Sequence, residues 1–223
     1  IKGLDEAIEG GFPEGSVILL TGPAGSGKTI LALHFAFLGA VLYDEPAFYI
    51  TVEEPAENIK AAAAALDLDL SVAGDKFQIL DFSDPDAPTF AKKGGWFDMD
   101  ALLDVIREKR ESMGVKRLVL DSVTAIIHRY KTTVSARRDF FRLVCNLKRW
   151  GITSLLLSCV REGSTELSQY GFEEYICDGV ILLGYERIRG SYLRWLTVRK
   201  MRFTNHSKRV MPLEISRQGV VVY

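Results

Sequence analysis

Cysteine is scarce in this sequence of 223 residues, which has only Cys145, Cys159 and Cys177, each among apolar neighbours. The three are widely spaced, and no two of them form a C-x-x-C pair. This scarcity argues against a secreted, disulfide-rich fold. We expect three reduced core thiols in a cytoplasmic protein.

Long apolar runs and a surplus of charge are also missing. No window approaches the roughly 18 consecutive apolar residues of a membrane-spanning helix, and the first residues lack the basic-then-apolar pattern of a signal peptide. We therefore expect a soluble protein that is not exported. The formal net charge is −1 and the isoelectric point is near 6.4, so any attraction to nucleic acid or membranes has to come from a local patch.

Apolar residues, by contrast, are abundant enough to build a sizeable core. They make up 48% of the chain, and charged residues make up 26%. The simplest interpretation is one α/β domain spanning residues 1–223. The sequence begins at Ile1 rather than at methionine, which suggests a piece excised from a longer protein.

From residue 16 onward, short apolar runs alternate with longer helical patterns, as in a parallel sheet with crossover helices. The expected strands are 16–21, 47–52, 77–81, 117–121 and 152–158. The expected helices are 28–42, 55–66, 98–114 and 135–151. Residues 82–98 are rich in proline, glycine and aspartate, and they predict a surface loop.

The pattern changes after residue 175, where strands follow one another without helices. Residues 179–203 predict a hairpin that turns near Arg189 and Gly190, and strands are expected at 210–215 and 219–223. The predicted fold class is therefore α/β, with a mainly parallel central sheet flanked by helices and a C-terminal antiparallel extension at one edge.

Residues 22–29, "GPAGSGKT", fit the phosphate-loop pattern G-x-x-x-x-G-K-[ST]. Its glycines allow backbone N–H groups to surround a phosphate, and the helix that follows adds its positive end. Lys28 is expected to reach the β- and γ-phosphates, and Thr29 to bind Mg²⁺. A glycine-rich turn without a ligand is the alternative, but the motif, the strand before it and the helix after it agree on a nucleotide. The expected contacts are Gly22, Pro23, Ala24, Gly25, Ser26, Gly27, Lys28, Thr29 and Ile30.

Acidic residues end two of the predicted strands at the same sheet edge as this loop. Asp121 follows "RLVL" directly, where it is expected to hold the hydrated Mg²⁺. Glu53 and Glu54 end the strand in "FYITVEEP", where a carboxylate can orient and deprotonate the attacking water. Both glutamates are candidate catalytic residues together with Lys28, and Glu53 is preferred. The alternative is that they only begin the helix at Pro55, where acidic residues are favourable.

With these motifs in this order, the chain resembles a RecA-superfamily ATPase, a P-loop NTPase, and more narrowly the KaiC family of clock ATPases and their archaeal relatives. The resemblance covers essentially the whole chain. It includes "GLDEAIEGGFPEGS" (3–16), "TVEEP" (51–55), "VLDSVTAI" (119–126) and "QYGFEEYICDGVILL" (169–183).

The most specific match is "KMRFTNHS" (200–207), which resembles a K-x-R-G-[TS]-x-H segment of that family. The resemblance implies that Lys200 and Arg202 contact ATP bound by a neighbouring protomer and that His206 is a further contact. Alternation along a strand places Lys200 and Arg202 on the same face. A solvated basic strand is the reading that the residues alone favour. Phe203 replaces the usual glycine.

Two further positions follow from the resemblance. Ser158 occupies a sensor-like position, although a lone serine can equally be a buried hydroxyl. The phosphorylating half of KaiC has adjacent serine and threonine where this chain has Glu174 and Tyr175. The chain therefore resembles the non-phosphorylating half, and we expect no autokinase activity there.

The resemblance implies a slow, Mg²⁺-dependent ATPase that assembles into a nucleotide-dependent ring, a homohexamer, and acts in signalling or assembly regulation. One alternative is a DNA-binding ATPase of the RecA or RadA type, because residues 128–138 are basic. Against it, residues 160–175 hold four glutamates and one arginine, and would repel DNA. A second alternative is a scaffold switched by nucleotide without hydrolysis.

Overall fold

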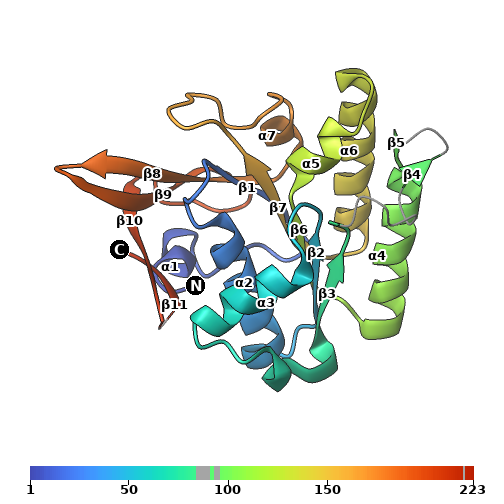
Figure 1. The fold of residues 1–223 in the computed structure, drawn as a ribbon, viewed down its shortest axis with the longest axis horizontal. Helices are drawn as coiled ribbons and strands as arrows, with labels where there is room; N and C mark the ends of the chain where they lie inside the picture. Colours follow the sequence, from blue (N-terminus) through green and yellow to red (C-terminus); the bar gives the residue numbers. More distant parts are fainter. Residues whose placement is uncertain (84–90, 93–95, 218) are drawn as a thin grey trace.

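A nine-stranded sheet carries the fold of the computed structural model, which describes residues 1–83, 91–92, 96–217 and 219–223 (Figure 1). Within these residues the strand order is β11-β10-β9-β8-β1-β7-β6-β2-β3. The parallel strands are β1 (Val17–Gly22), β2 (Ala47–Thr51), β3 (Phe77–Asp81), β6 (Arg117–Asp121) and β7 (Thr153–Cys159). The C-terminal strands are β8 (Gly179–Ile188), β9 (Ser191–Met201), β10 (Val210–Ser216) and β11 (Gly219–Val222).

Helices cover both faces of the sheet. One face packs against α1 (Leu4–Ala7), α2 (Lys28–Leu42) and α3 (Ala56–Ala65), and the other against α4 (Met99–Met113), α5 (Val123–His128) and α6 (Thr133–Arg149). α2 is buried on several sides, as its almost wholly apolar sequence predicts. The core is therefore divided into two layers by the sheet.

The two ends of the parallel strands carry different parts of the sequence. β1 ends at Gly22 opposite Cys159, and β2 ends at Thr51 opposite Asp121. The phosphate loop and the acidic strand ends therefore lie together at the carboxyl end of the parallel strands. β8 runs parallel to β1, and its first residue, Gly179, pairs with both Ile18 of β1 and Met201 at the end of β9. The end of β9 therefore lies at the amino end of the parallel strands, opposite the phosphate loop.

The structure confirms the predicted fold class and each predicted strand within one residue at either end. The hairpin of β8 and β9 turns at Arg189 and Gly190, as expected. Of the loop predicted over 82–98, residues 84–90 and 93–95 lie outside the described part. The rest corrects the prediction, because β4 (Ala91–Lys92) and β5 (Trp96–Phe97) pair as a short antiparallel ladder.

Several short helices were not predicted from the sequence. They are α1, α5, the 3₁₀ segment η1 (Leu70–Lys76) and α7 (Glu173–Ile176). α5 forms because the Ser122 hydroxyl accepts the backbone N–H of Ala125 and caps its first turn. No helix in the described residues has both the length and the apolarity that crossing a bilayer requires.

Candidate functional site

The phosphate loop connects β1 to α2 in a conformation that requires glycine. A Cβ on Gly22 would lie 2.5 Å from the carbonyl oxygen of Leu183, which is closer than real Cβ contacts come. Gly27, just before α2, has φ +97°, in the region that favours glycine. The loop is thus a tight curve of backbone at a helix N-terminus, a cradle that fits a phosphate group.

Lys28 lies inside this curve. Its Nζ donates to the carbonyl oxygens of Gly22 (2.8 Å) and Pro23 (2.9 Å), and the residue is only 8% exposed. Burial lowers the pKa of the Lys28 ammonium below its ordinary value, against the opposing effect of nearby groups that include Asp121. Ser26 donates to Pro23 as well and so tightens the loop (2.8 Å).

Asp121 and Thr29 meet across the strand end, as the sequence predicted for a Mg²⁺ site. The Thr29 hydroxyl donates to Asp121 Oδ2 at 2.9 Å, and Tyr49 donates to the same oxygen at 2.8 Å. Burial raises the pKa of Asp121, and these two hydrogen bonds oppose the rise. Sequence reasoning missed Tyr49, because nothing in the apolar strand "AFYIT" marks its hydroxyl as aimed at Asp121.

The donor set fits Mg²⁺, which prefers hard oxygen ligands and retains several waters. Thr29 and Asp121 provide one hydroxyl and one carboxylate. The described residues contain no group of three or more His, Cys, Asp or Glu side chains able to hold a metal by themselves. A metal here therefore depends on phosphate and water oxygens for its other ligands.

Glu53 and Glu54 line the same cavity as the phosphate loop. Ser122, at the end of the neighbouring strand, donates to Glu53 Oε2 at 2.6 Å and so orients this carboxylate. Thr51 donates to the backbone carbonyl of Glu54 (2.6 Å). The first N–H group of the following helix, that of Ala56, donates to Asp81 rather than to either glutamate (2.6 Å).

The cavity of about 520 Å³ is also lined by four residues that the sequence did not single out for the site, namely Thr51, Cys159, Arg194 and Ile215. Arg194 donates to the carbonyl oxygen of Gly25 (3.0 Å) and stacks on the Tyr185 ring at 4.8 Å. Arg194 and Ile215 come from β9 and β10, and no sequence signal shows that these strands return to the loop.

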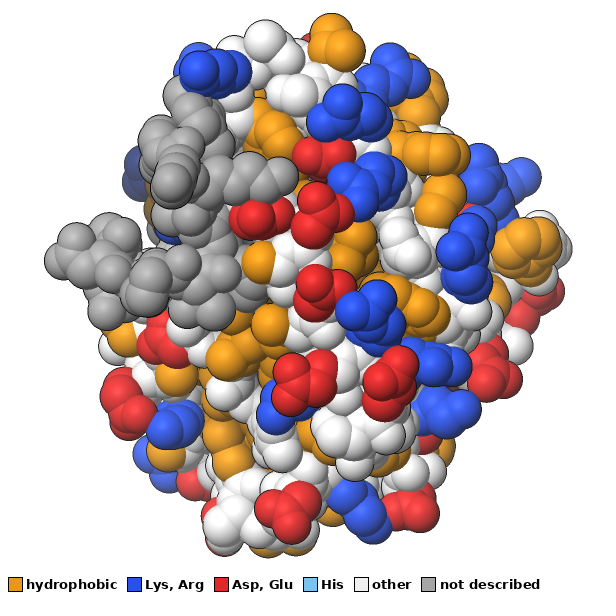
Figure 2. Space-filling model, turned by 90° about the vertical axis from the view of Figure 1, so that its right-hand side faces the viewer, with side chains coloured by type: hydrophobic (Ala, Val, Ile, Leu, Met, Phe, Trp, Pro, Cys, Tyr) orange, Lys and Arg blue, Asp and Glu red, His pale blue; other side chains and the backbone are white. Residues whose placement is uncertain are grey.

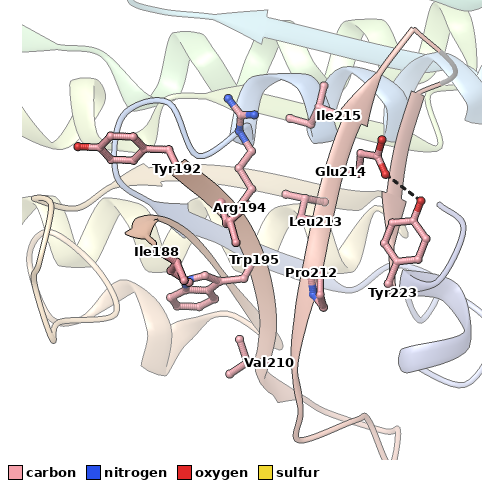
Figure 3. A pocket seen from close by; sticks show the side chains of 11 residues that line it. Ile188, Tyr192, Arg194, Trp195, Val210, Pro212, Leu213, Glu214, Ile215 and Tyr223 are labelled. Carbon is pink, nitrogen blue, oxygen red and sulfur yellow. Dashed lines mark hydrogen bonds between the residues drawn. The ribbon is translucent and has the colours of Figure 1, made fainter. Parts of the chain in front are cut away.

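Figure 3 shows Arg194 and Ile215 at the side of a second, largely apolar groove of about 530 Å³ between β9 and β10. Arg194 and Ile215 thus line both this groove and the cavity of the phosphate loop. Tyr192 and Trp195 of β9 also line this groove.

The structure corrects one sequence expectation near the loop. Cys159 is not a core thiol: it is half-buried, borders the cavity and lies beside Lys28, and burial raises the pKa of its thiol. Cys145 is also half-buried, and only Cys177 is fully buried. Ser158 is fully buried, with its hydroxyl 3.4 Å from that of Thr124, as in the buried-hydroxyl alternative.

Lys200 and Arg202 lie far from the phosphate loop of the same chain, at the amino end of the parallel strands. Lys200 Nζ donates to the carbonyl oxygens of Glu174 (2.9 Å) and Cys177 (2.6 Å), and Arg202 donates to Asp178 Oδ1 (3.2 Å). Burial, and after it the charge of Arg202, lowers the pKa of Lys200 below its ordinary value.

The residues that follow Arg202 lie at the same end of the sheet. Phe203 is 84% exposed and has φ +71°, a conformation that favours glycine. His206 is half-buried, with Nδ1 at 3.0 Å from the carbonyl oxygen of Ser207. The backbone thus keeps the glycine-type conformation even though phenylalanine occupies the position.

Comparisons with known proteins agree with this arrangement. The family model of the KaiC ATPase matches residues 1–223. The circadian clock oscillator protein KaiC of Parasynechococcus marenigrum (strain WH8102) is 33% identical over all of this chain and 44% of its own length. That of Acaryochloris marina (strain MBIC 11017) is 35% identical over all of this chain and 43% of its own length.

The chain thus spans less than half the length of these curated relatives. Among solved structures, a KaiC-like protein from the hyperthermophilic archaeon Pyrococcus horikoshii OT3 superposes with a TM-score of 0.86 at 36% identity. That match covers all of this chain and 96% of the archaeal one. The chain therefore belongs to the KaiC family of ATPases.

Proposed function

We propose that this domain, residues 1–223, hydrolyses ATP with Mg²⁺ at a site that two protomers share. One observation carries the proposal. The phosphate loop with its acidic residues lies at the carboxyl end of the parallel strands, and the cations Lys200 and Arg202 lie at the amino end. Neither cation reaches the loop of its own chain. When the end of one protomer that carries Lys200 and Arg202 stacks on the phosphate-loop end of the next, the two parts of the site come together.

On the loop side, the roles follow from the contacts. The glycine cradle and Lys28 hold the phosphates. Thr29 and Asp121 would hold Mg²⁺, and the bound ion would supply positive charge beside the phosphates. Glu53, oriented by Ser122, accepts the proton of the attacking water, and Glu54 beside it adds negative charge.

Arg194 and Ile215 lie against the phosphate loop at Gly25 and Gly27, and in this proposal they contact the bound nucleotide. The cations of the second protomer complete the site in this proposal. Lys200 and Arg202 stabilise the negative charge on the transferring phosphoryl group, and His206 contacts the same nucleotide.

Contacts of this kind join unlike surfaces head to tail, and such contacts close into a ring when the rotation between neighbours allows it. The family resemblance favours six subunits and slow turnover, with the ATP state acting as a signal for assembly or partner binding.

The DNA-binding alternative is less favoured by the surface. Figure 2 shows acidic and basic side chains interspersed on the face formed by α4 and α6. Arg142 of α6 pairs with Asp100 and with Asp139 (3.3 Å), and Arg138 pairs with Asp139 (3.2 Å). Ion pairing of this kind lowers the charge that is free to bind phosphates. The scaffold alternative keeps the same nucleotide site and differs only in the absence of turnover.

The test is ATP turnover of Glu53→Gln and Lys200→Ala, together with the mass of the particles formed with Mg·ATP. We expect both variants to assemble and to lose most of their turnover, because one lacks the base and the other the shared cation. Lys60→Ala, which removes an exposed lysine on α3, is the matched control and keeps wild-type turnover. Wild-type rates in both variants from a protein that stays monomeric with ATP would refute the shared site.

A further inference from the structure

Asp178 is a buried carboxylate outside the nucleotide cavity, at the end of the sheet that carries Lys200 and Arg202. Its side chain is only 1% exposed. Oδ1 accepts from Lys148 Nζ at 2.7 Å and from an Arg202 guanidinium nitrogen at 3.2 Å, and Oδ2 accepts from the backbone N–H of Val17 at 3.2 Å. Burial would raise the pKa of Asp178, but these donors outweigh it and hold the pKa below its ordinary value. The carboxylate is therefore a charged junction between α6, β1 and the turn that follows β9.

The backbone around Asp178 reinforces this junction. The N–H of Asp178 donates to the carbonyl oxygen of Val17 (2.8 Å), and the N–H of Arg202 donates to the carbonyl oxygen of Asp178 (3.0 Å). Lys200 is held by two carbonyl oxygens of the preceding residues, those of Glu174 and Cys177. One short segment, 174–178, thus fixes both cations.

The ion pair with Asp178 restrains the Arg202 side chain but does not occupy all of its N–H donors. It remains 46% exposed although it is paired with Asp178. A guanidinium has five N–H donors, and a contact through one nitrogen leaves others free for a phosphate. A carboxylate behind the guanidinium restricts a flexible side chain that otherwise samples many rotamers.

We propose that Asp178 is a positioning residue that orients Arg202 toward the nucleotide of the neighbouring protomer. The inference rests on the proposed shared site and adds a residue that does not itself touch the nucleotide. Preorganisation of this kind has a large effect on rate, since a displacement of about 1 Å can cost about 100-fold. Asp178→Asn keeps the size of the side chain and removes the charge that orients Arg202.

For Asp178→Asn alone we expect turnover about 10- to 100-fold below wild type. Binding of a fluorescent ATP analogue by the unassembled variant stays unchanged, because the phosphate loop lies at the other end of the parallel strands. Lys148→Met removes the other ion-pair partner of Asp178 and leaves Arg202 in place. We expect turnover close to wild type in that control. An equal loss in Lys148→Met would show that the junction serves the fold only, and would overturn the proposal.

The decisive experiment mixes subunits. Lys28→Ala disables the phosphate loop but leaves Asp178 and the cations intact, whereas Asp178→Asn leaves the loop intact. In mixed assemblies, a Lys28→Ala protomer supplies well-positioned cations to the intact loop of an Asp178→Asn neighbour. Equal, random mixing should restore about a quarter of wild-type turnover, since half of the loops are intact and half of those have such a neighbour.

The same mixing with Lys200→Ala in place of Asp178→Asn separates the two proposals. Recovery with Lys200→Ala but not with Asp178→Asn would overturn the role of Asp178 and leave the shared site standing. Recovery with neither would overturn the shared site itself. If Asp178→Asn does not fold, as judged by circular dichroism, Asp178→Glu is mixed instead, because it keeps the charge but displaces Arg202.

Discussion

Tyr49 offers a direct test of how the site holds Asp121. This tyrosine of β2 is fully buried, and its hydroxyl donates to Asp121 Oδ2 at 2.8 Å. Thr29 is the other donor to that oxygen. Replacing Tyr49 by phenylalanine removes one hydroxyl and leaves the ring packing in place. The buried Asp121 carboxylate then keeps only one of these two donors.

The expected cost follows from this geometry. A hydrogen bond to a charged group contributes about 1.5–3 kcal/mol to the free energy of unfolding. For a chain of this length, a loss of about 2 kcal/mol lowers Tm by about 4–8 °C. The pKa of Asp121, already raised by burial, should rise further, because the Tyr49 hydrogen bond opposes that rise. We also expect weaker stabilisation of the variant by Mg·ATP.

The assay is thermal and urea unfolding of Tyr49→Phe, with and without Mg·ATP. Tyr43→Phe is the matched control, because Tyr43 is 62% exposed and its ring keeps the contact with Arg117. The control should change Tm very little. A Tyr49→Phe protein as stable as wild type, with equal stabilisation by Mg·ATP, would refute the claim that this hydroxyl supports Asp121.

Three further predictions concern other parts of the chain. Phe203→Gly should raise the free energy of unfolding by about 0.5–1 kcal/mol in urea, because φ is +71° and the exposed ring loses little packing; unchanged or lower stability would contradict this. Burial lowers the pKa of His34 below 6.5, so the unfolded chain binds more protons and stability should fall as pH drops below about 6.5. His34→Gln should flatten this dependence in urea unfolding between about pH 5 and 8, and an equally steep variant would count against it. Incubation with ATP should leave the intact mass unchanged, given Glu174 and Tyr175; stoichiometric phosphate on neighbouring serine or threonine would overturn the absence of autokinase activity.

Local sequence was sufficient where one segment contains the whole feature. The phosphate loop is contiguous, and the strands before and after it are marked by apolar runs, so strands such as 77–81 and 117–121 could be predicted to the residue. The meeting of Thr29 with Asp121 also followed, because parallel strands end at one sheet edge. Lys200 and Arg202 were assigned by resemblance rather than by any local pattern.

The features that were missed depend on contacts between distant segments. Whether Tyr49 faces Asp121 depends on the register of β2 against β6, which alternation alone does not fix. Arg194 reaches the loop only because β9 lies two strands away from β1. Asp178 lies within the family-like segment 169–183, but nothing in that segment marks its side chain, whose contacts come from three separate parts of the chain.

The central claim is that hydrolysis requires a second protomer. The most direct measurement is turnover per protomer over a dilution series in Mg·ATP, with the assembled fraction counted in the same samples by mass photometry. Turnover per protomer should rise and fall with the assembled fraction and vanish in the monomer. Constant turnover per protomer down to concentrations at which only monomers are present would contradict the shared site.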